Sequence, residues 1–242
     1  QGLGHADQSC AGVVRAFTYR YTGKASQEGA VTPVIFLDYL GVALFAATGA
    51  LAASRKQLDI IGFLFLAAVT GIGGGTARDL VLGVPVFWVA QHTYIVVCAV
   101  TACLVYFLAH LIESRYRLLL WLDAVALAAF SVFGAYKGLT VTGSAVVAVI
   151  MGIFTGTLGG ILRDVLAGEP SVLLRQEIYV AAALAGAGTF VAISLAGGLP
   201  GLAAAGGFAV TLAVRSGALH FGWTLPSYKS RPGRAPDGPA RR

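Results

Sequence analysis

The chain contains few charged residues. Asp, Glu, Lys and Arg together account for 12% of its 242 residues, whereas 57% are hydrophobic. Soluble domains contain about 25% charged residues, so this chain cannot cover a globular surface with groups that water solvates well. Its mean hydropathy of +0.79 indicates the same. The composition therefore excludes an ordinary soluble domain and predicts an integral membrane protein surrounded by membrane lipid.

Cysteines and the usual catalytic groupings are also scarce. The three cysteines, Cys10, Cys98 and Cys103, show neither a metal-binding spacing nor a disulfide framework. The sequence offers no Ser-His-Asp, Cys-His or metal-ligating constellation. The net charge of +6 lies mostly in the ends and short loops, without a basic face interleaved with aromatic residues. We therefore expect no enzyme activity, no cofactor, no metal site and no nucleic-acid partner.

Apolar stretches long enough to cross a membrane make up most of the chain. A crossing helix needs about 20 predominantly apolar residues. Gly, Pro and charged residues, including Gly138, separate seven candidates. We expect all seven to be helices, at residues 34–53, 58–77, 91–112, 118–137, 143–163, 176–197 and 201–219. The predicted fold is therefore an all-α membrane protein with seven transmembrane helices.

The middle of the chain is duplicated. Residues 70–85 read TGIGGGTARDLVLGVP and residues 155–170 read TGTLGGILRDVLAGEP, a shift of 155 − 70 = 85 residues. The same shift carries Asp38 onto Asp123 without a gap. Each copy holds three of the predicted helices. Because three is an odd number, the second copy enters the membrane from the opposite side, and the two halves are inverted.

This organisation predicts five segments. They are a polar N-terminal tail (1–30), a first three-helix repeat (31–116), a second, inverted repeat (117–200), a seventh transmembrane helix (201–223) and a basic, disordered C-terminal tail (224–242). The loop cations on the side that includes the C-terminus are Arg55, Lys56, Arg115, Arg117 and Arg175. The positive-inside rule then predicts a cytoplasmic C-terminus and an N-terminus outside.

Glycines cluster inside the second and fifth predicted helices. They are Gly71, Gly73, Gly74, Gly75, Gly156, Gly159 and Gly160. Each interior glycine weakens a helix by about 1 kcal/mol relative to alanine, and a loosened backbone is tolerated in a membrane only where protein or water surrounds it. One interpretation is a kinked or broken helix facing a central pathway. The other is close helix packing, since glycines four residues apart let helices approach.

An Arg-Asp pair follows each glycine cluster. The pairs are Arg78 with Asp79 and Arg163 with Asp164. An unpartnered charge near the bilayer centre costs about 2.5 kcal/mol or more. Neighbouring residues do not face each other on a helix, so we expect each arginine to pair with a carboxylate elsewhere. The alternative is that both pairs snorkel to the membrane surface. In either case the symmetry puts one pair at each mouth of a central path.

Three further charges belong to the candidate pathway. Asp38 starts the first predicted helix and Asp123 the fourth, where each acid either stabilises a helix N-terminus or pairs with an arginine. Lys137 has no charged counterpart, because Ala52 occupies the equivalent position. It is either an ordinary lysine at the end of a helix or an asymmetric gating charge that senses voltage or repels cations.

The duplicated motif resembles that of a known family. The patterns G-x-G-G-G-x-x-R-D-x-x-x-G-x-P and G-x-x-G-G-x-x-R-D-x-x-x-G-x-P resemble the prokaryotic trimeric intracellular cation (TRIC) channels over about residues 34–219. The resemblance implies a homotrimer with one pore per protomer, shaped by glycine-kinked second and fifth helices. It implies passage of potassium and other monovalent cations such as sodium, and a place in the plasma (inner) membrane. Related sequences are also described as glycine transporters.

The leading hypothesis is therefore a homotrimeric, potassium-permeable cation channel. The alternative is an alternating-access transporter of glycine or another small zwitterion, which the same inverted architecture serves equally well. A third hypothesis is a membrane scaffold that transports nothing.

Overall fold

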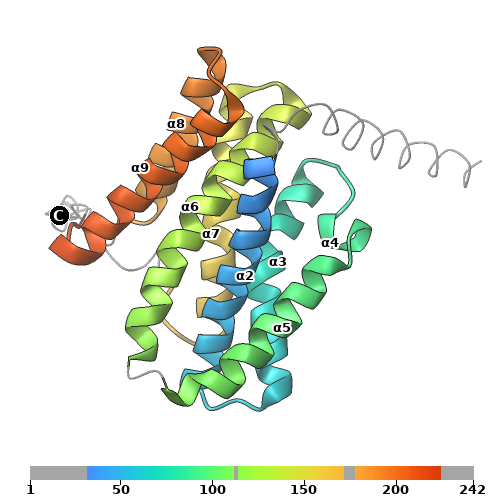
Figure 1. Ribbon diagram of the computed structural model, residues 1–242, viewed down its shortest axis with the longest axis vertical. Coiled ribbons are helices and arrows are strands. Elements are labelled where there is room, and N and C mark those ends of the chain that lie inside the picture. Colours follow the sequence, from blue (N-terminus) through green and yellow to red (C-terminus); the bar gives the residue numbers. More distant parts are fainter. Residues whose placement is uncertain (1–31, 112–113, 172–177, 225–242) are drawn as a thin grey trace, which may run out of the picture.

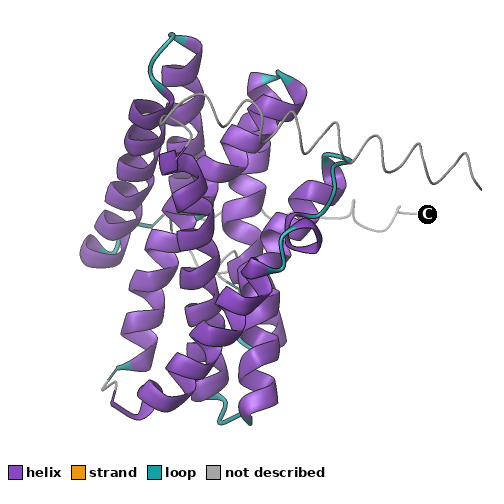
Figure 2. Ribbon diagram, turned by 45° about the vertical axis from the view of Figure 1, so that its right-hand side comes forward, coloured by secondary structure: helices purple, strands orange, loops and turns teal. Residues whose placement is uncertain are grey.

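The chain folds into a bundle of helices, shown by a computed structural model (Figures 1 and 2). The structure describes residues 32–111, 114–171 and 178–224; most of the two predicted tails and Arg175 lie outside them. Every regular element in the described residues is a helix. In chain order these are α2 (Thr32–Arg55), α3 (Ile60–Val81), α4 (Phe87–Ala90), α5 (Thr93–Leu108), the 3-10 helix η1 (Ala109–Leu111), α6 (Arg115–Thr142), α7 (Ala145–Leu166), α8 (Val180–Leu195) and α9 (Pro200–Phe221).

Six of the described helical segments are long and apolar enough to cross a membrane: α2, α3, α5 together with η1, α6, α7 and α9. The predicted all-helical membrane protein is thereby confirmed. The remaining predicted crossing, at 176–197, corresponds to α8, whose 16 residues span about 24 Å at 1.5 Å per residue. Its length alone does not establish a seventh crossing. The short helix α4 was not predicted.

Among the predicted C-terminal helix ends, those of the second, fourth and fifth helices fall furthest short of the observed ends. The prediction stopped the second helix at residue 77 and the fifth at residue 163, whereas α3 continues to Val81 and α7 to Leu166. The break expected at Gly138 does not occur, because α6 runs through it to Thr142. Charges near these ends suggested the membrane surface. Their partners inside the bundle, described below, allow the helices to continue past them.

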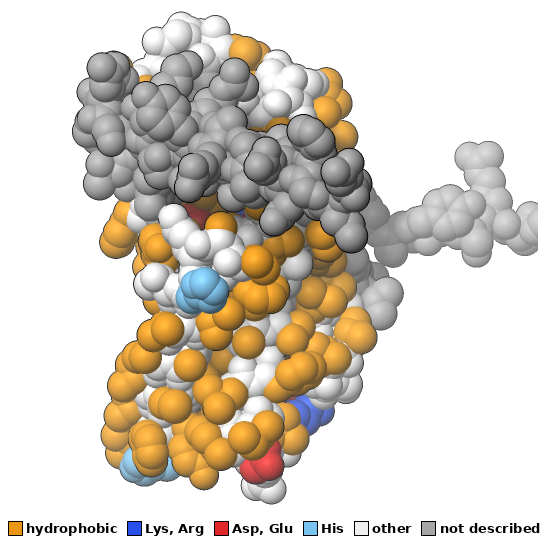
Figure 3. Space-filling view, turned by 90° about the vertical axis from the view of Figure 1, so that its right-hand side faces the viewer, with side chains coloured by type: hydrophobic (Ala, Val, Ile, Leu, Met, Phe, Trp, Pro, Cys, Tyr) orange, Lys and Arg blue, Asp and Glu red, His pale blue; other side chains and the backbone are white. Residues whose placement is uncertain are grey.

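Helices α2 and α6 lie at the centre of the bundle. They pack against each other, with α5 on one side and α8 and α9 on the other, while α7 lies behind them and contacts both α6 and α3 (Figure 1). Helix α5 lies at the periphery and exposes large apolar side chains, among them Val96, Val100 and Phe107. Figure 3 shows a surface on this side of the bundle where hydrophobic side chains predominate. Such a surface is suited to lipid rather than to water.

Corresponding helix ends in the two halves are built alike. The Asp59 side chain caps α3 by accepting a hydrogen bond from the backbone N–H three residues later, and Ser144 does the same for α7. These two caps are 144 − 59 = 85 residues apart. After the C-terminal ends, Gly83 and Gly168 have φ angles of 65° and 62°, a left-handed conformation that glycine adopts at least cost. Both helices of the duplicated motif thus begin and end in the same way.

Glycines also set how closely the helices of each half pack. A Cβ atom added at Gly49 of α2 would collide with the carbonyl oxygen of Leu66 in α3. At the equivalent position of the second half, a Cβ added at Gly134 of α6 would lie 2.6 Å from the carbonyl oxygen of Met151 in α7. Both contacts involve backbone atoms, which cannot rotate away as a side chain can. The first two helices of each half therefore touch backbone to backbone.

We predict that Gly49→Ala destabilises the protein. The added methyl group must push α2 and α3 apart, and overpacking of this kind costs about 1–3 kcal/mol. Thermal unfolding in detergent should therefore shift to a lower temperature. Gly188→Ala in α8 is the matched control, because nothing lies within 4 Å of its added Cβ. Equal shifts for the two variants would contradict this account of the packing.

Candidate functional site

Helices α3 and α7 cross so closely that neither has room for a side chain at the contact. A Cβ added at Gly74 would lie 2.6 Å from the carbonyl oxygen of Thr155, and one added at Gly159 would lie 2.8 Å from that of Thr70. The two contacts are equivalent under the 85-residue shift. In each contact, the glycine lies further toward the C-terminal end of its helix than the residue it touches does in the other helix. The helices therefore run antiparallel where they cross, as Figure 1 also shows.

The flanking glycines pack against the central helices. A Cβ at Gly71 would lie 3.0 Å from the carbonyl oxygen of Val42 in α2, and one at the equivalent Gly156 would lie 2.7 Å from Ser131 Oγ in α6. Both α3 and α7 are continuous α-helices through their glycines. These contacts support the close-packing interpretation and show no broken helix in the described residues. Whether the glycines kink the helices stays a prediction.

Two of the three other predicted glycines, Gly75 and Gly160, lie close to aromatic side chains. A Cβ at Gly73 would meet only the end of a leucine side chain of α7. A Cβ at Gly75 would lie 2.6 Å from the ring of Phe87 in α4, and one at Gly160 would lie 2.7 Å from the hydroxyl of Tyr179, just before α8. Both aromatic residues also border the two groups of buried charges described next.

The first charge cluster consists of Asp38, Arg78, Asp79 and Lys137, all buried. Arg78 Nε donates to Asp79 Oδ1 at 2.8 Å, and Lys137 Nζ donates to the same oxygen at 2.7 Å. The backbone N–H of Phe87 donates to Asp79 Oδ2 at 2.9 Å. One carboxylate thus gathers donors from α3, α4 and α6.

Tyr94 of α5 binds the other acid of this cluster. Its hydroxyl donates to Asp38 Oδ2 at 2.5 Å. Its ring stacks on Tyr39, with the centroids 4.3 Å apart, and meets Phe87 edge-on at 4.6 Å. Asp38 also interacts electrostatically with Arg78. Aromatic side chains from α2, α4 and α5 therefore enclose the first charge cluster.

The second charge cluster consists of Asp123, Arg163, Asp164 and Arg215, also buried. Arg163 joins two acids: Nη1 donates to Asp123 Oδ1 at 2.7 Å, while Nε and Nη2 donate to Asp164 Oδ1 at 3.0 and 2.8 Å. The Arg215 guanidinium of α9 lies 5.0 Å from the ring centroid of Tyr179. Like the first, this cluster combines two carboxylates with two cations, which balances its formal charge.

The clusters occupy opposite ends of the α3–α7 crossing. Each Arg-Asp pair lies after the crossing glycine of its own helix. Because the two helices are antiparallel at the contact, the pairs lie toward opposite ends of the bundle. The two Arg-Asp pairs are thus separated by the crossing of their own helices.

The predicted arginine partners were partly wrong. Arg163 does pair across helices with Asp123, but it also binds its neighbour Asp164, and Arg78 binds only its neighbour Asp79. The rule that adjacent residues diverge concerns the direction of Cβ, and a long arginine side chain can curl back around it. Neither arginine snorkels to the surface, since Arg78 is 1% and Arg163 is 2% exposed.

Three other predicted charges lie deeper than expected. Helix α2 begins at Thr32 and α6 at Arg115, so Asp38 and Asp123 are not terminal residues and do not act as N-terminal acids of those helices. Lys137 is 4% exposed and paired, so it is not an ordinary lysine at a helix end. Its role as a gating charge stays a prediction.

Sequence analysis overlooked Arg215, whose side chain is fully buried in α9. Its signal was an arginine inside a predicted apolar crossing, where an ionisable residue is rarely without function. It also did not assign Tyr94 or Tyr179 to the site, although the 85-residue shift relates them. A tyrosine hydroxyl carries no charge, so composition alone does not single it out.

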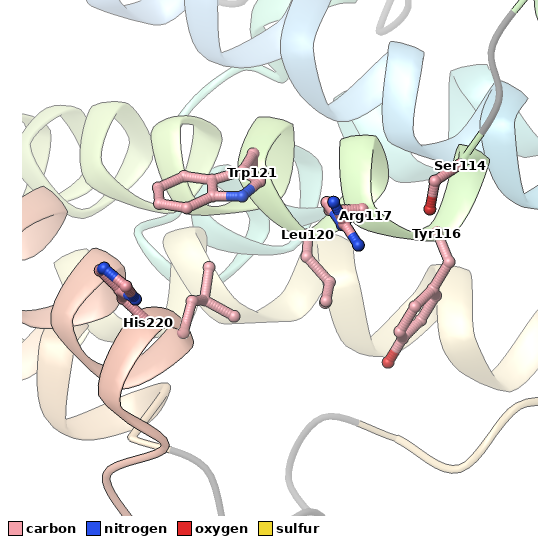
Figure 4. Close-up of a pocket in the computed structure, with 7 residues that line it drawn as sticks. Ser114, Tyr116, Arg117, Leu120, Trp121 and His220 are labelled. Carbon is pink, nitrogen blue, oxygen red and sulfur yellow. The ribbon is translucent and has the colours of Figure 1, made fainter.

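One hollow of about 520 Å³ lies apart from both clusters. Figure 4 shows its labelled side chains on the start of α6 and the end of α9. The hollow is lined by Ser114, Tyr116, Arg117, Leu120, Trp121, Leu219 and His220. It includes no predicted pathway residue, so it gives no support to a path between the clusters. Among the described residues, no group of three or more His, Cys, Asp or Glu side chains is placed to hold a metal ion.

We predict that Arg163→Lys destabilises the protein more than Arg78→Lys. Arg163 donates three hydrogen bonds to two acids, whereas Arg78 donates one through Nε. Lysine can replace one such bond but not three, and a hydrogen bond to a charged group contributes about 1.5–3 kcal/mol. Thermal unfolding in detergent should rank the two variants. A larger loss for Arg78→Lys would show that these contacts do not determine stability.

Comparison with known proteins shows to which family this chain belongs. Residues 35–110 and 120–194 match a family described as "Glycine transporter", and the two matches begin 120 − 35 = 85 residues apart. The UPF0126 membrane protein of Vibrio cholerae is 40% identical over 210 residues, which cover 84% of this chain and 86% of the relative. The UPF0126 inner membrane protein YadS of Escherichia coli K12 is 39% identical over 201 residues, covering 81% and 96%.

Solved structures extend the comparison. The TRIC trimeric intracellular cation channel orthologue from Rhodobacter sphaeroides is 51% identical, with a TM-score of 0.78 over 79% of this chain and 100% of that chain. Another TRIC cation channel structure is 29% identical, with a TM-score of 0.73 over 82% and 98%. These relatives are channels and not enzymes, which confirms that this chain is not an enzyme. The chain is therefore a multi-pass membrane protein of the TRIC channel family, which includes the UPF0126 proteins.

Proposed function

We propose that this chain forms a homotrimeric channel for monovalent cations, permeable to potassium and sodium, with one pore in each protomer. The observation that carries the proposal is the pair of charge-balanced clusters on either side of the α3–α7 crossing. Each cluster brings two carboxylates into an otherwise apolar bundle, and such a carboxylate attracts a permeating cation once its own cationic partner moves away. The likeness to solved TRIC cation channels supports it, and the Rhodobacter sphaeroides relative is described as trimeric.

In this proposal seven helices cross the membrane as two inverted three-helix repeats followed by α9. The antiparallel crossing and the equivalent contacts 85 residues apart support the inversion. Helix α8 serves as the sixth crossing, because a bilayer can thin around a helix that is somewhat short. The cations Arg55, Lys56, Arg115 and Arg117 lie near the end of α2 and the start of α6, and by the positive-inside rule they support a cytoplasmic C-terminus in this proposal.

The proposed pathway passes the α3–α7 crossing and includes both clusters. Ions pass when the glycine-weakened helices bend apart at Gly74 and Gly159. Lys137 acts as the gating charge. Its ammonium group lies on the Asp79 carboxylate, where a permeating cation would otherwise be attracted, so conduction requires Lys137 to move away. The second charge cluster has no lysine, and its Arg163 is held by two acids.

The purified protein in planar bilayers should carry unitary potassium currents. Lys137→Met should increase the open probability at least several-fold, because it removes the cation that competes for Asp79. Lys56→Met is the matched control, since this lysine is exposed beside Glu169 and lies outside both clusters. Its currents should match those of the unaltered protein.

Two results would count against the channel proposal. A purified trimer that gives no unitary potassium current at any voltage would remove conduction altogether. Currents that respond equally to Lys137→Met and Lys56→Met would remove the gating role assigned to Lys137 while leaving conduction in place.

A second candidate function is alternating-access transport of glycine or a similar small zwitterion. The match of both halves to the family described as "Glycine transporter" favours it, and inverted repeats are common in such carriers. Saturable glycine uptake into liposomes without single-channel currents would select this function over the channel.

A further inference from the structure

Arg78 differs from its repeat equivalent Arg163 in how its guanidinium nitrogens are paired. In Arg163, Nε, Nη1 and Nη2 all donate to carboxylate oxygens, at 3.0, 2.7 and 2.8 Å. In Arg78, Nε donates to Asp79, but the buried Nη1 and Nη2 have no hydrogen-bond partner among the residues that the structure describes. The whole side chain is only 1% exposed. Within the described residues, two charged donor groups of the first charge cluster are therefore unpaired.

The neighbouring acids explain why Arg78 lacks partners. Asp79 already accepts from Arg78 Nε, from Lys137 and from the Phe87 backbone. Asp38 is equivalent to the acid that binds Arg163 Nη1, but here its Oδ2 accepts the hydroxyl of Tyr94. Tyr179, the repeat equivalent of Tyr94, also interacts with Asp123 in the second charge cluster. The feature that distinguishes the first charge cluster is therefore Lys137 on Asp79.

An acceptor for these two nitrogens is expected on physical grounds. A buried charged donor without a partner is costly, and such groups are rarely left unsatisfied. The terminal nitrogens of a guanidinium form a planar fork that matches a carboxylate with two parallel hydrogen bonds. Arg78 Cζ lies 5.8 Å from the Phe87 ring centroid and 5.0 Å from that of Phe133. Rings close to the guanidinium restrict the approach of a bulky group.

Charge balance limits the choice of ligand. The first charge cluster already combines two carboxylates with two cations, and a net charge added to a buried site is unfavourable. A zwitterion adds no net charge. Its carboxylate suits Arg78, and its ammonium group suits Asp38, which interacts electrostatically with Arg78. The ligand must be small, because the rings of Phe87 and Phe133 lie beside the Arg78 guanidinium.

We propose that Arg78 binds the carboxylate of a small zwitterion through Nη1 and Nη2, with Asp38 facing the ammonium group. This site rests on the second candidate function and names the residues that would bind its zwitterion in the first charge cluster; it does not depend on cation conduction. The second charge cluster lacks it, because Arg163 has both terminal nitrogens occupied by acids.

Equilibrium binding of radiolabelled glycine to the purified protein in nanodiscs tests the site. Glycine should bind saturably, with acetate and methylammonium competing at least about tenfold more weakly, because each supplies only one of the two charges. Chloride at the same concentration should not displace glycine. Absence of saturable glycine binding, or displacement by chloride as effective as by glycine, would overturn the proposal.

Variants distinguish the two ends of the ligand. Arg78→Lys should weaken glycine binding at least about tenfold, since lysine cannot form the fork. Arg55→Lys is the control, because this arginine pairs with Glu169 outside the clusters. If Arg78→Lys does not fold, Asp38→Asn provides the test: glycine binding should fall while acetate binding persists. Unchanged glycine binding in a folded Arg78→Lys or Asp38→Asn protein would refute the assignment.

Potassium currents recorded from the same preparation separate this site from the proposed channel. A protein that conducts but does not bind glycine overturns the zwitterion site alone. A protein that binds glycine through Arg78 but does not conduct overturns the channel alone.

Discussion

The reciprocal contact between α3 and α7 is the constraint on which the rest of the structure depends. Gly74 lies against the backbone of Thr155, and Gly159 lies against that of Thr70. A two-fold axis generates such a pair of contacts, in which each side contributes the same surface. The crossing is antiparallel, which is the relation expected between the two inverted halves of the proposed arrangement. Any side chain at the two glycines would separate the halves.

The buried charges follow from this geometry. In an apolar bundle each charge needs a partner within reach, and each helix of the duplicated motif carries its Arg-Asp pair beyond the crossing. The partners come from a neighbouring helix: α6 supplies Lys137 to Asp79 and Asp123 to Arg163. The clusters therefore join the two halves while concentrating acids at either end of one crossing. Packing and candidate function depend on the same residues.

Two kinds of feature could be predicted from the sequence: those that recur along the chain, such as the duplicated motif, and those set by length, such as helices long enough to cross a membrane. Hydrophobic stretches located the helices, and the 85-residue shift identified Gly74 with Gly159 before the contact between their helices was known. Pairing was harder to predict. It depends on how a long side chain curls, as in Arg78 with Asp79, and on which of several acids is nearest. Arg215 was missed because it has no equivalent in the first half.

Closely similar halves can still differ in chemistry. The equivalents of Arg78, Asp79 and Asp38 are all conserved in type within the chain, yet only the first charge cluster receives a lysine. That single ammonium group occupies Asp79 and leaves part of the neighbouring guanidinium without partners. A duplicated sequence motif therefore yields two sites whose charged groups are paired differently. This asymmetry is the source of both the proposed gate and the proposed zwitterion site.

Sidedness of the two halves tests the central claim most directly. Single cysteines would be introduced by Gln57→Cys and Thr142→Cys, at exposed positions 142 − 57 = 85 residues apart, in a chain whose native cysteines are replaced by serine. A membrane-impermeant maleimide should label Thr142→Cys in intact cells and Gln57→Cys only in inside-out vesicles. Labelling of both positions from the same side of the membrane would contradict the inverted arrangement.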